Sequence, residues 1–210
     1  MMTPPDQKKI LILFAHPALE KSRVNVHLTK AVKGLEGVHF HDLYQEYPDF
    51  HIDVKREQEL LSQHDVIIFH HPFFWYSTPA ILKEWQDLVL EHGWAYGSQG
   101  NALKGKLFMN VITTGGKEIA YHAEGYNGLT VRQLLAPLEQ TVNLCKMIFL
   151  APFIVHGTHS ITPEDITRYK SEYRDLVLAL SENRVDIEMS RKLIRINDQL
   201  EKVIHQMEVK

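Results

Sequence analysis

The apolar residues of this 210-residue chain fall into short runs that predict five strands. The runs at residues 10–15 and 66–69 are continuous and rich in β-branched residues, which indicates strands buried on both faces. Residues 107–112 and 147–155 predict two further strands. Residues 38–43 alternate apolar and polar side chains, a pattern that suits a strand at the edge of a sheet.

Segments with helical spacing separate these strands. One begins near Ser22, others cover residues 54–63, 80–89 and 131–145, and the last opens at Pro163. Strands that alternate with helices predict βαβ units and a parallel α/β sheet. For five strands we expect the doubly wound, flavodoxin-like order 2-1-3-4-5, in which the loops after the first, third and fourth strands meet in one crevice.

The end of the chain departs from this alternation. Between residues 186 and 207 the apolar positions are spaced by four, three, four, three and four residues, close to the seam of a coiled coil. The spacing predicts an extra C-terminal helix that folds on a dimer of the chain or docks on a partner protein. We therefore expect a main domain of residues 1–184 and an amphipathic extension of residues 185–210.

Composition narrows the classes of function. A net charge of −3, with both signs spread along the chain, gives no electrostatic footprint for nucleic acid. The 13 histidines are scattered without a third acidic or thiol ligand nearby, so no metal site is expected. The single cysteine, Cys145, lies on an apolar helix face and predicts an inert thiol. With no secretory signal and no run long enough to span a bilayer, we expect a cytoplasmic protein.

Aromatic residues fill the loop after the third strand, namely Phe73, Phe74, Trp75 and Tyr76. Open α/β sheets bind ligands at this position, where loops are normally polar. Two interpretations stay open on this loop alone. The rings form a wall for a flat, apolar ligand, or they pack a dimer seam or the protein's own core.

The other two converging loops carry polar groups. The first leads into a helix whose free N–H groups, with the Ser22 hydroxyl and the Asn25 amide, form an anion site to which His16 adds a donor. The alternative is that Ser22 only caps the helix and His16 is a satisfied strand-end residue. Residues 113–116 offer hydroxyls and close backbone approach, although they also suit a plain turn. Together, an anion cradle, an aromatic wall and an N–H-rich edge match the three parts of flavin mononucleotide (FMN).

Other chemistries of α/β proteins fit poorly. Residues 15–20 contain no glycine, so the first loop is not a dinucleotide-binding turn. The sequence has no GxxxxGK[ST] phosphate loop and no GxSxG nucleophile elbow. The strand ends carry histidines and threonines in place of the acidic cluster that holds magnesium in receiver domains.

Several motifs, taken together, resemble one family. They are Ala15-His16-Pro17, Ser22-Arg23-Val24-Asn25, the run from His71 to Lys83, Gly93-Trp94-Ala95-Tyr96-Gly97 and Thr113-Thr114-Gly115-Gly116. Over residues 8–180 the chain resembles the NAD(P)H:quinone oxidoreductases with a flavodoxin-like fold. Within them it is most similar to the bacterial ancillary subunits of glutathione-gated potassium efflux systems.

The resemblance implies a flavin, FMN as in the bacterial branch or FAD as in the animal one. By position it assigns the ring to Phe73, Phe74, Trp75 and Tyr76, its polar edge to residues 113–116, and the phosphate to His16, Ser22, Arg23, Val24 and Asn25. Tyr121 falls where the animal enzymes carry a tyrosine that hydrogen-bonds the ring and substrate during hydride transfer.

Two points of the implied site stay open. The alternative for Tyr121 is an exposed loop tyrosine without a catalytic role. Asn127 replaces the histidine of the animal enzymes, which puts that half of the catalytic pair in doubt. His122 would substitute only if the loop bends differently.

The implied reaction is a two-electron, ping-pong hydride transfer from NAD(P)H through the flavin to a quinone. The implied assembly is a homodimer that completes each site, with residues 93–105 as the expected contact. The alternative function is regulatory, as a redox-sensing subunit of a potassium/proton antiporter with incidental reductase activity. In that role the chain would be peripheral on the inner face of the membrane.

Overall fold

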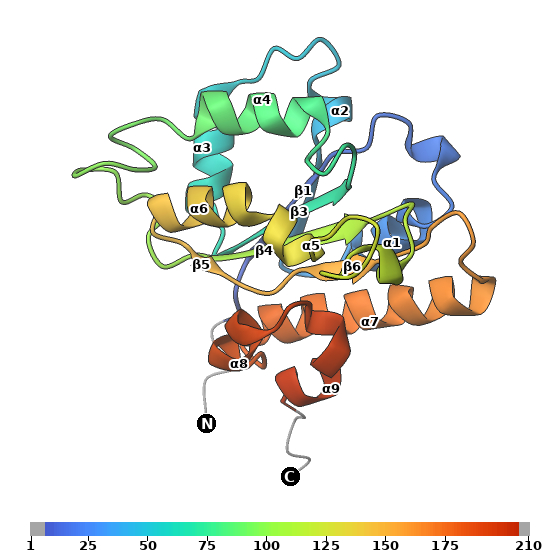
Figure 1. The fold of residues 1–210 in the computed structure, drawn as a ribbon. Helices are drawn as coiled ribbons and strands as arrows, with labels where there is room; N and C mark the ends of the chain where they lie inside the picture. The colour runs from blue at the N-terminus through green and yellow to red at the C-terminus, as the bar shows by residue number, and fades with distance from the viewer. Residues whose placement is uncertain (1–6, 206–210) are drawn as a thin grey trace.

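The structure, a computed structural model, describes residues 7–205. Its centre is a parallel sheet (Figure 1) with the order β2-β1-β3-β4-β5 and with β6 also paired to β4. The strands are β1 (Ile10–Phe14), β2 (Val38–Asp42), β3 (Val66–Pro72), β4 (Leu107–Thr113), β5 (Ile148–Phe149) and β6 (Phe153–Val155). The predicted flavodoxin-like order 2-1-3-4-5 is confirmed.

Burial along the strands follows the hydrophobic pattern. All residues of β1, β3 and β4 are buried, whereas β2 at the sheet edge is only partly so. The prediction of one continuous strand over residues 147–155 is wrong, because β5 and β6 are separate. Pro152 lacks an N–H to donate, and the neighbouring Ala151 N–H bonds to the Ser190 carbonyl at 3.3 Å. The chain therefore leaves the sheet between two short stretches that both pair with β4.

Helices cover the sheet on both faces (Figure 1). On one face lie α3 (Val54–Gln63), α4 (Ala80–Val89) and α6 (Ala136–Leu144), whose apolar residues form one core with the sheet. The other face carries α1 (Asn25–Val32) and α7 (Pro163–Ser181). The short segments before residue 185 are α2 (Leu43–Glu46), α5 (Val131–Leu134) and the 3-10 turns η1 (Leu19–Lys21) and η2 (Glu118–Ala120).

Local signals explain most helix ends. Asp53 accepts a hydrogen bond from the Arg56 N–H at the start of α3, and Thr162 caps α7 in the same way. The predicted single helix over residues 131–145 is instead α5 and α6, which meet at Leu135. Pro137 stands in the first turn of α6, where a missing N–H costs nothing, but it cannot continue a helix that arrives from α5.

The predicted C-terminal extension is helical, but it is not one continuous helix. Three short segments follow residue 185, namely α8 (Ile187–Lys192), the 3-10 turn η3 (Ile196–Gln199) and α9 (Leu200–Val203). Leu193 is extended, with φ −75° and ψ 154°, because the backbone turns here to reach the sheet. The Ile196 N–H then bonds to the Pro152 carbonyl at 2.9 Å. These long-range bonds override the local helical pattern.

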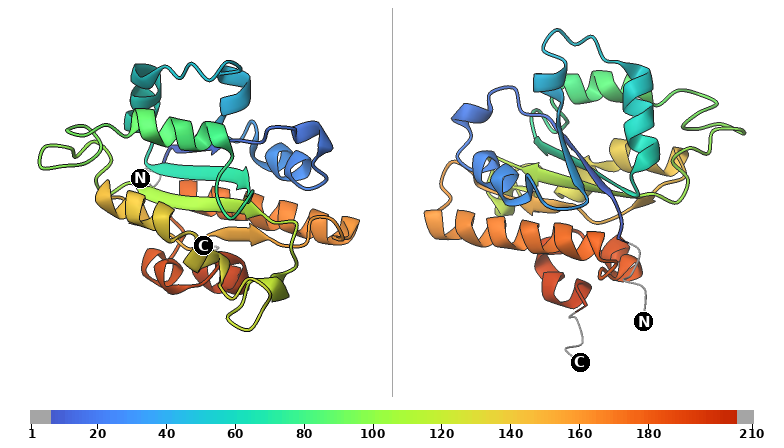
Figure 2. Two further views of the ribbon diagram at one scale, coloured as in Figure 1. Left: turned by 45° about the horizontal axis from the view of Figure 1, so that its top comes forward. Right: turned by 180° about the vertical axis from the view of Figure 1, so that it is seen from behind.

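Residues 185–205, which we call the tail, pack on their own chain. Ile196 and Val203 are fully buried in the core that α1 and α7 share, and Met189, Leu193 and Leu200 pack against it. Both views in Figure 2 place the tail beside α7. The apolar positions expected on a dimer or partner seam therefore face the protein's own core, while Met207 lies outside the described residues. The division at residue 184 stays a prediction.

Within residues 7–205, no helix has the length and apolar character needed to cross a membrane. Cys145 is buried, as expected, and burial raises the pKa of its thiol to about 11.

Candidate functional site

A cleft of about 350 Å³ opens at the carboxyl ends of β1, β3 and β4. The three predicted loops meet there, together with the loop after β6. Predicted residues that line the cleft are His16, Ser22, Arg23, Asn25, Phe73, Phe74, Thr113 and Gly115. The other lining residues, to which the sequence interpretation gave no role in the site, are Ala18, Lys21, Pro72, Thr158 and His159. Thr158 and His159 could have been found, because the carboxyl ends of all parallel strands share one edge.

The first loop supplies free backbone donors. Ser22 Oγ accepts from the Asn25 N–H at 3.0 Å, so its hydroxyl satisfies the first N–H of α1, although the N-cap position itself is Val24. Among the described residues, no acceptor is recorded for the N–H groups of Arg23 and Val24. The Val24 side chain is fully buried, which leaves only its backbone to face a ligand. Free N–H groups at a helix start attract anions, so capping and anion binding are compatible here.

Asn25 is a buried junction under this loop. Its Nδ2 donates to Ser22 Oγ and to Thr113 Oγ1, each at 3.0 Å. Its Oδ1 accepts from His70 Nε2 at 3.1 Å. One amide thereby joins the start of α1 to the ends of β3 and β4. Since Asn25 is only 2 % exposed, its side chain shapes the cleft from below.

The tautomer of His70 follows from these partners. Burial lowers its pKa to about 3, so the ring is neutral at pH 7. Because Asn25 Oδ1 only accepts, the proton is on His70 Nε2, and Nδ1 faces the Tyr173 hydroxyl at 3.5 Å. A buried chain of polar groups therefore runs from α7 through β3 to the first loop.

His16 and Arg23 have distinct roles at the cleft. His16 Nδ1 accepts from the Ala18 N–H at 3.1 Å, which leaves a protonated Nε2 on the neutral ring. Burial lowers the His16 pKa, against the opposing effect of Glu20. Arg23 donates to the carbonyls of His159 and Ile161, both at 3.2 Å. Arg23 thus ties the first loop to the loop after β6, while Nε2 of His16 is left as a neutral donor.

The aromatic loop splits into two parts. Phe73 is 8 % exposed and packs in a small core with Ile112 and Ile154. Phe74 lines the cleft, where its ring meets that of His16 edge to face at 6.1 Å. Trp75 is 94 % exposed, so within this chain it does not contact the cleft.

The tip of the aromatic loop is a tight turn. The Ser77 N–H bonds to the Phe74 carbonyl at 3.0 Å, and the two residues between them have φ of 50° and 62°. Positive φ at both central positions is the condition of a type I′ turn, which favours glycine and asparagine. Strained backbone of this kind clusters at ligand sites.

Residues 113–116 form the third wall. The Thr114 hydroxyl donates to the Gly116 carbonyl at 2.8 Å, so its oxygen is left to accept from His156 Nδ1 at 3.0 Å. A Cβ on Gly115 would stand 2.6 Å from His159 Nε2, and one on Gly116 would stand 3.1 Å from the Tyr121 ring. A side chain at Gly115 would force the His159 ring to shift, and one at Gly116 would require a smaller movement of the Tyr121 ring.

Tyr121 lies beside this wall. Its ring faces that of His156 at 5.2 Å, and burial, the largest cause, raises the pKa of its phenol. A phenol that stays protonated is able to donate a hydrogen bond. Asn127 accepts from the Tyr76 hydroxyl at 3.0 Å, and His122 lines a separate surface hollow with Ile119 and Glu124. The loop does not bend His122 into the cleft.

The cleft fits a flavin mononucleotide in its donor set and size. About 300–1,000 Å³ is usual for small-molecule sites, and this volume lies at the lower end. Free N–H groups, His16 and Lys21 suit a phosphate, Phe74 offers an aromatic face, and Gly115 lines the cleft without a side chain. Within the described part of the chain, no cluster of histidine, cysteine and acidic side chains has the arrangement of a metal site.

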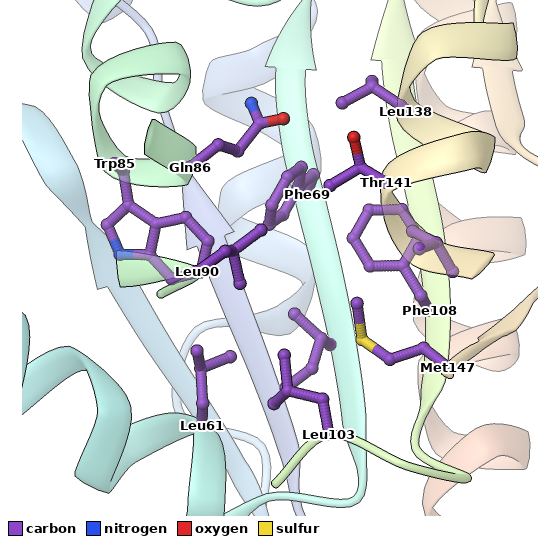
Figure 3. A pocket seen from close by; sticks show the side chains of 12 residues that line it. Leu61, Phe69, Trp85, Gln86, Leu90, Leu103, Phe108, Leu138, Thr141 and Met147 are labelled. Carbon is purple, nitrogen blue, oxygen red and sulfur yellow. The ribbon is translucent and has the colours of Figure 1, made fainter. Parts of the chain in front are cut away.

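Figure 3 shows another cavity, which lies between α4, α6 and the sheet. Apolar and aromatic side chains point into it, among them Phe69, Trp85, Phe108 and Met147. Its volume of about 10 Å³ is the space of a single water. It is a packing gap in the core and not a ligand site.

Comparisons with known proteins agree with this geometry. A potassium-efflux ancillary protein, KefG of Pectobacterium atrosepticum, is 46 % identical over 82 % of this chain and 93 % of its own. A solved general stress protein 14 from Treponema denticola, in complex with FMN, is 36 % identical with a TM-score of 0.78, covering 82 % of this chain and 99 % of its own.

A solved NADPH-quinone reductase from P. pentosaceus is 33 % identical with a TM-score of 0.73, over 80 % of this chain and 96 % of its own. The model of the family described as "Flavodoxin-like fold" matches residues 8–177. The chain belongs to this family of flavodoxin-like proteins.

Proposed function

We propose that this chain is an FMN-dependent NAD(P)H:quinone oxidoreductase. The observation that carries the proposal is the cleft itself, which Arg23 with its free N–H group, the Phe74 ring and Gly115 line together. The FMN complex of one relative and the name NADPH-quinone reductase of another support it. FMN is preferred to FAD because a relative's complex contains FMN.

Each group of residues is proposed to hold a different part of FMN. The N–H groups of Arg23 and Val24, the Ser22 hydroxyl and His16 Nε2 hold the phosphate. Lys21 adds a positive charge beside it. Phe74 and the turn at residues 75–76 flank the ring, and residues 113–116 present their backbone to its polar edge. When bound, FMN supplies the carrier of the two electrons and the hydride.

Tyr121 is the proposed catalytic residue. Its protonated phenol donates a hydrogen bond at the polar edge of the site, where negative charge builds up during hydride transfer. Because Asn127 is engaged with Tyr76 and His122 is turned away, no histidine of this loop shares that task. The proposed mechanism therefore relies on one hydrogen-bond donor in place of a tyrosine–histidine pair.

Steady-state kinetics test the enzyme proposal. One site that serves NAD(P)H and quinone in turn gives ping-pong kinetics, so double-reciprocal plots at several quinone concentrations should be parallel. Intersecting lines would contradict a shared site. An absence of NAD(P)H oxidation by the FMN-loaded protein would refute the enzyme altogether.

The proposed assembly is a homodimer. Large apolar side chains near the cleft are strongly exposed, with Trp75 at 94 %, Tyr126 at 95 % and Ile119 at 76 %. Exposed aromatic clusters typically mark interfaces. Residues 93–105 stay the proposed contact, in a form that Lys146 holds through bonds to the Gly97 and Gly100 carbonyls. Light scattering after size exclusion should give twice the chain mass, and the chain mass alone would refute the dimer.

A second function rests on the 46 % identity to KefG. In it the chain is a cytoplasmic, redox-sensing subunit that binds a membrane potassium/proton antiporter at its inner face. Co-expression with such an antiporter, followed by membrane fractionation, tests this function. Membrane recovery only when the antiporter is present supports the role. Equal recovery without the antiporter contradicts it.

A further inference from the structure

The tail contacts the segment between β4 and α5 that carries the proposed catalytic tyrosine. We call this segment, residues 114–130, the Tyr121 loop. The family match ends at residue 177, so the tail lies beyond it. In the left view of Figure 2 the yellow-green Tyr121 loop lies next to the red tail.

Arg195 makes the first contact. Its Nη2 is 2.8 Å from Glu118 Oε1, three positions before Tyr121, and its Nε donates to Asp198 Oδ1 at 2.5 Å. Arg195 is 17 % exposed, whereas Glu118 is 51 % exposed. The arginine is therefore fixed by Asp198 inside the tail, and it holds the more exposed Glu118 in place.

Arg132 makes the second contact, just after the Tyr121 loop ends. It donates to the backbone carbonyl of Leu193 and pairs with Glu139 at 3.0 Å. Residues 193 and 195 of the tail thus hold both ends of the Tyr121 loop, one at Glu118 and the other at Arg132.

The tail itself is anchored to the sheet edge beside the site. Asn197 Oδ1 accepts from the Ile154 N–H of β6 at 2.8 Å, and the Ile196 N–H bonds to the Pro152 carbonyl at 2.9 Å. The same strand leads directly to His156, on which the Tyr121 ring packs. The tail that contacts the Tyr121 loop is therefore itself held on the edge of the sheet.

We propose that the tail is a brace for the Tyr121 loop and that Arg195 is a positioning residue, which acts through Glu118 to keep Tyr121 at the polar edge of the site. This inference rests on the proposed function, because it gives Tyr121 a catalytic role. It also gives a role to a tail that packs on its own chain and does not form the predicted coiled-coil seam.

The test uses the full chain and point variants, because deletion of the tail would remove the fully buried Ile196 and Val203 and expose the core that they share with α1 and α7. The variants are Arg195→Ala and Arg195→Lys. The matched control is Arg191→Ala, whose side chain pairs with Glu188 in the same tail at 3.3 Å. Hydrogen exchange of residues 117–130 is measured without added flavin. FMN affinity and the kcat and KM for NADPH are measured with it.

For Arg195→Ala we expect exchange in the Tyr121 loop to rise about two- to fivefold, the range of a partly exposed ion pair. We expect kcat to fall by a similar factor, with FMN affinity and the KM for NADPH unchanged. Arg195→Lys should restore part of the loop protection and part of kcat, and Arg191→Ala should change neither the loop exchange nor kcat. In a Glu118→Ala background, Arg195→Ala should have no further effect on loop exchange.

Two results would overturn the brace. Wild-type exchange in the Tyr121 loop of Arg195→Ala would show that the contact holds nothing. An equal rise over the whole chain would show a general loss of stability with no positioning. If the wild-type protein itself fails to oxidise NADPH, the proposed function is refuted, while the exchange data still decide whether the tail holds the loop.

Discussion

Replacement of Asn25 by alanine tests how the cleft is built. The substitution removes the donors to Ser22 Oγ and Thr113 Oγ1 and the acceptor of His70 Nε2. His70 is fully buried, so its N–H would be left without a partner, at about 1–3 kcal/mol. The other two hydrogen bonds contribute about 0.5–1.5 kcal/mol each. We expect Asn25→Ala to lower the free energy of unfolding by about 2–6 kcal/mol.

Urea denaturation and thermal melting measure this loss. In a chain of this size 1 kcal/mol corresponds to about 2–4 °C, so Tm should fall by at least about 4 °C. Asn143→Ala is the control, because Asn143 is exposed on α6 and should stay within about 0.5 kcal/mol of the wild type.

Asn25→Asp separates the two halves of the amide. It keeps an acceptor for His70, loses both donors, and adds a negative charge below the proposed phosphate site. Its FMN affinity should therefore fall below that of Asn25→Ala. A change in stability under about 0.5 kcal/mol for Asn25→Ala would refute the idea that this amide organises the three loops.

The remaining predictions concern other parts of the molecule. Trp75→Gly should raise the stability of the flavin-free protein by about 1 kcal/mol, because glycine adopts the positive φ of this position without strain. The same substitution should weaken FMN retention, and tighter FMN binding would contradict the proposed aromatic wall. Burial lowers the pKa of His70 to about 3 and of His71 to about 4, so below pH 6.5 the unfolded chain binds more protons than the folded one. When the pH falls from 7 to 5, each of these two histidines should lower the free energy of unfolding by about 2 kcal/mol. Equal urea midpoints at the two pH values would argue against neutral buried rings. Cys145 should react with a thiol reagent at neutral pH only as fast as the protein opens, and stoichiometric labelling within the mixing time would contradict its burial. Tyr121→Phe should lower the rate of FMN reduction by NADPH about tenfold at unchanged FMN affinity, and an unchanged rate in stopped-flow would remove Tyr121 from the mechanism.

The sequence predicts the parts of the fold that local rules decide. Short apolar runs rich in β-branched residues favour buried strands, and the helices expected over residues 54–63 and from Pro163 begin where the structure has them. The order of the strands follows from the alternation of strands and helices, because right-handed crossovers leave few arrangements.

Long-range contacts decide what the sequence interpretation missed. The tail has the spacing of a helix, but two long-range hydrogen bonds, from the Ile196 N–H to the Pro152 carbonyl and from the Ile154 N–H to Asn197 Oδ1, break that helix. In the candidate site, the convergence of the three loops was predictable from topology. The role of each residue in the site was not predictable, because it depends on partners far apart in sequence, such as Arg23 with the His159 carbonyl. Likewise, nothing local shows that Trp75 is almost fully exposed and outside the lining of the cleft.

The most direct test of the account is the visible absorption spectrum of the purified protein with FMN. The account predicts one FMN bound per chain, a band that bleaches when NADPH is added without oxygen, and recovery of the band when a quinone follows. A protein that takes up no FMN, or whose bound FMN is not reduced by NADPH, would contradict the proposed function.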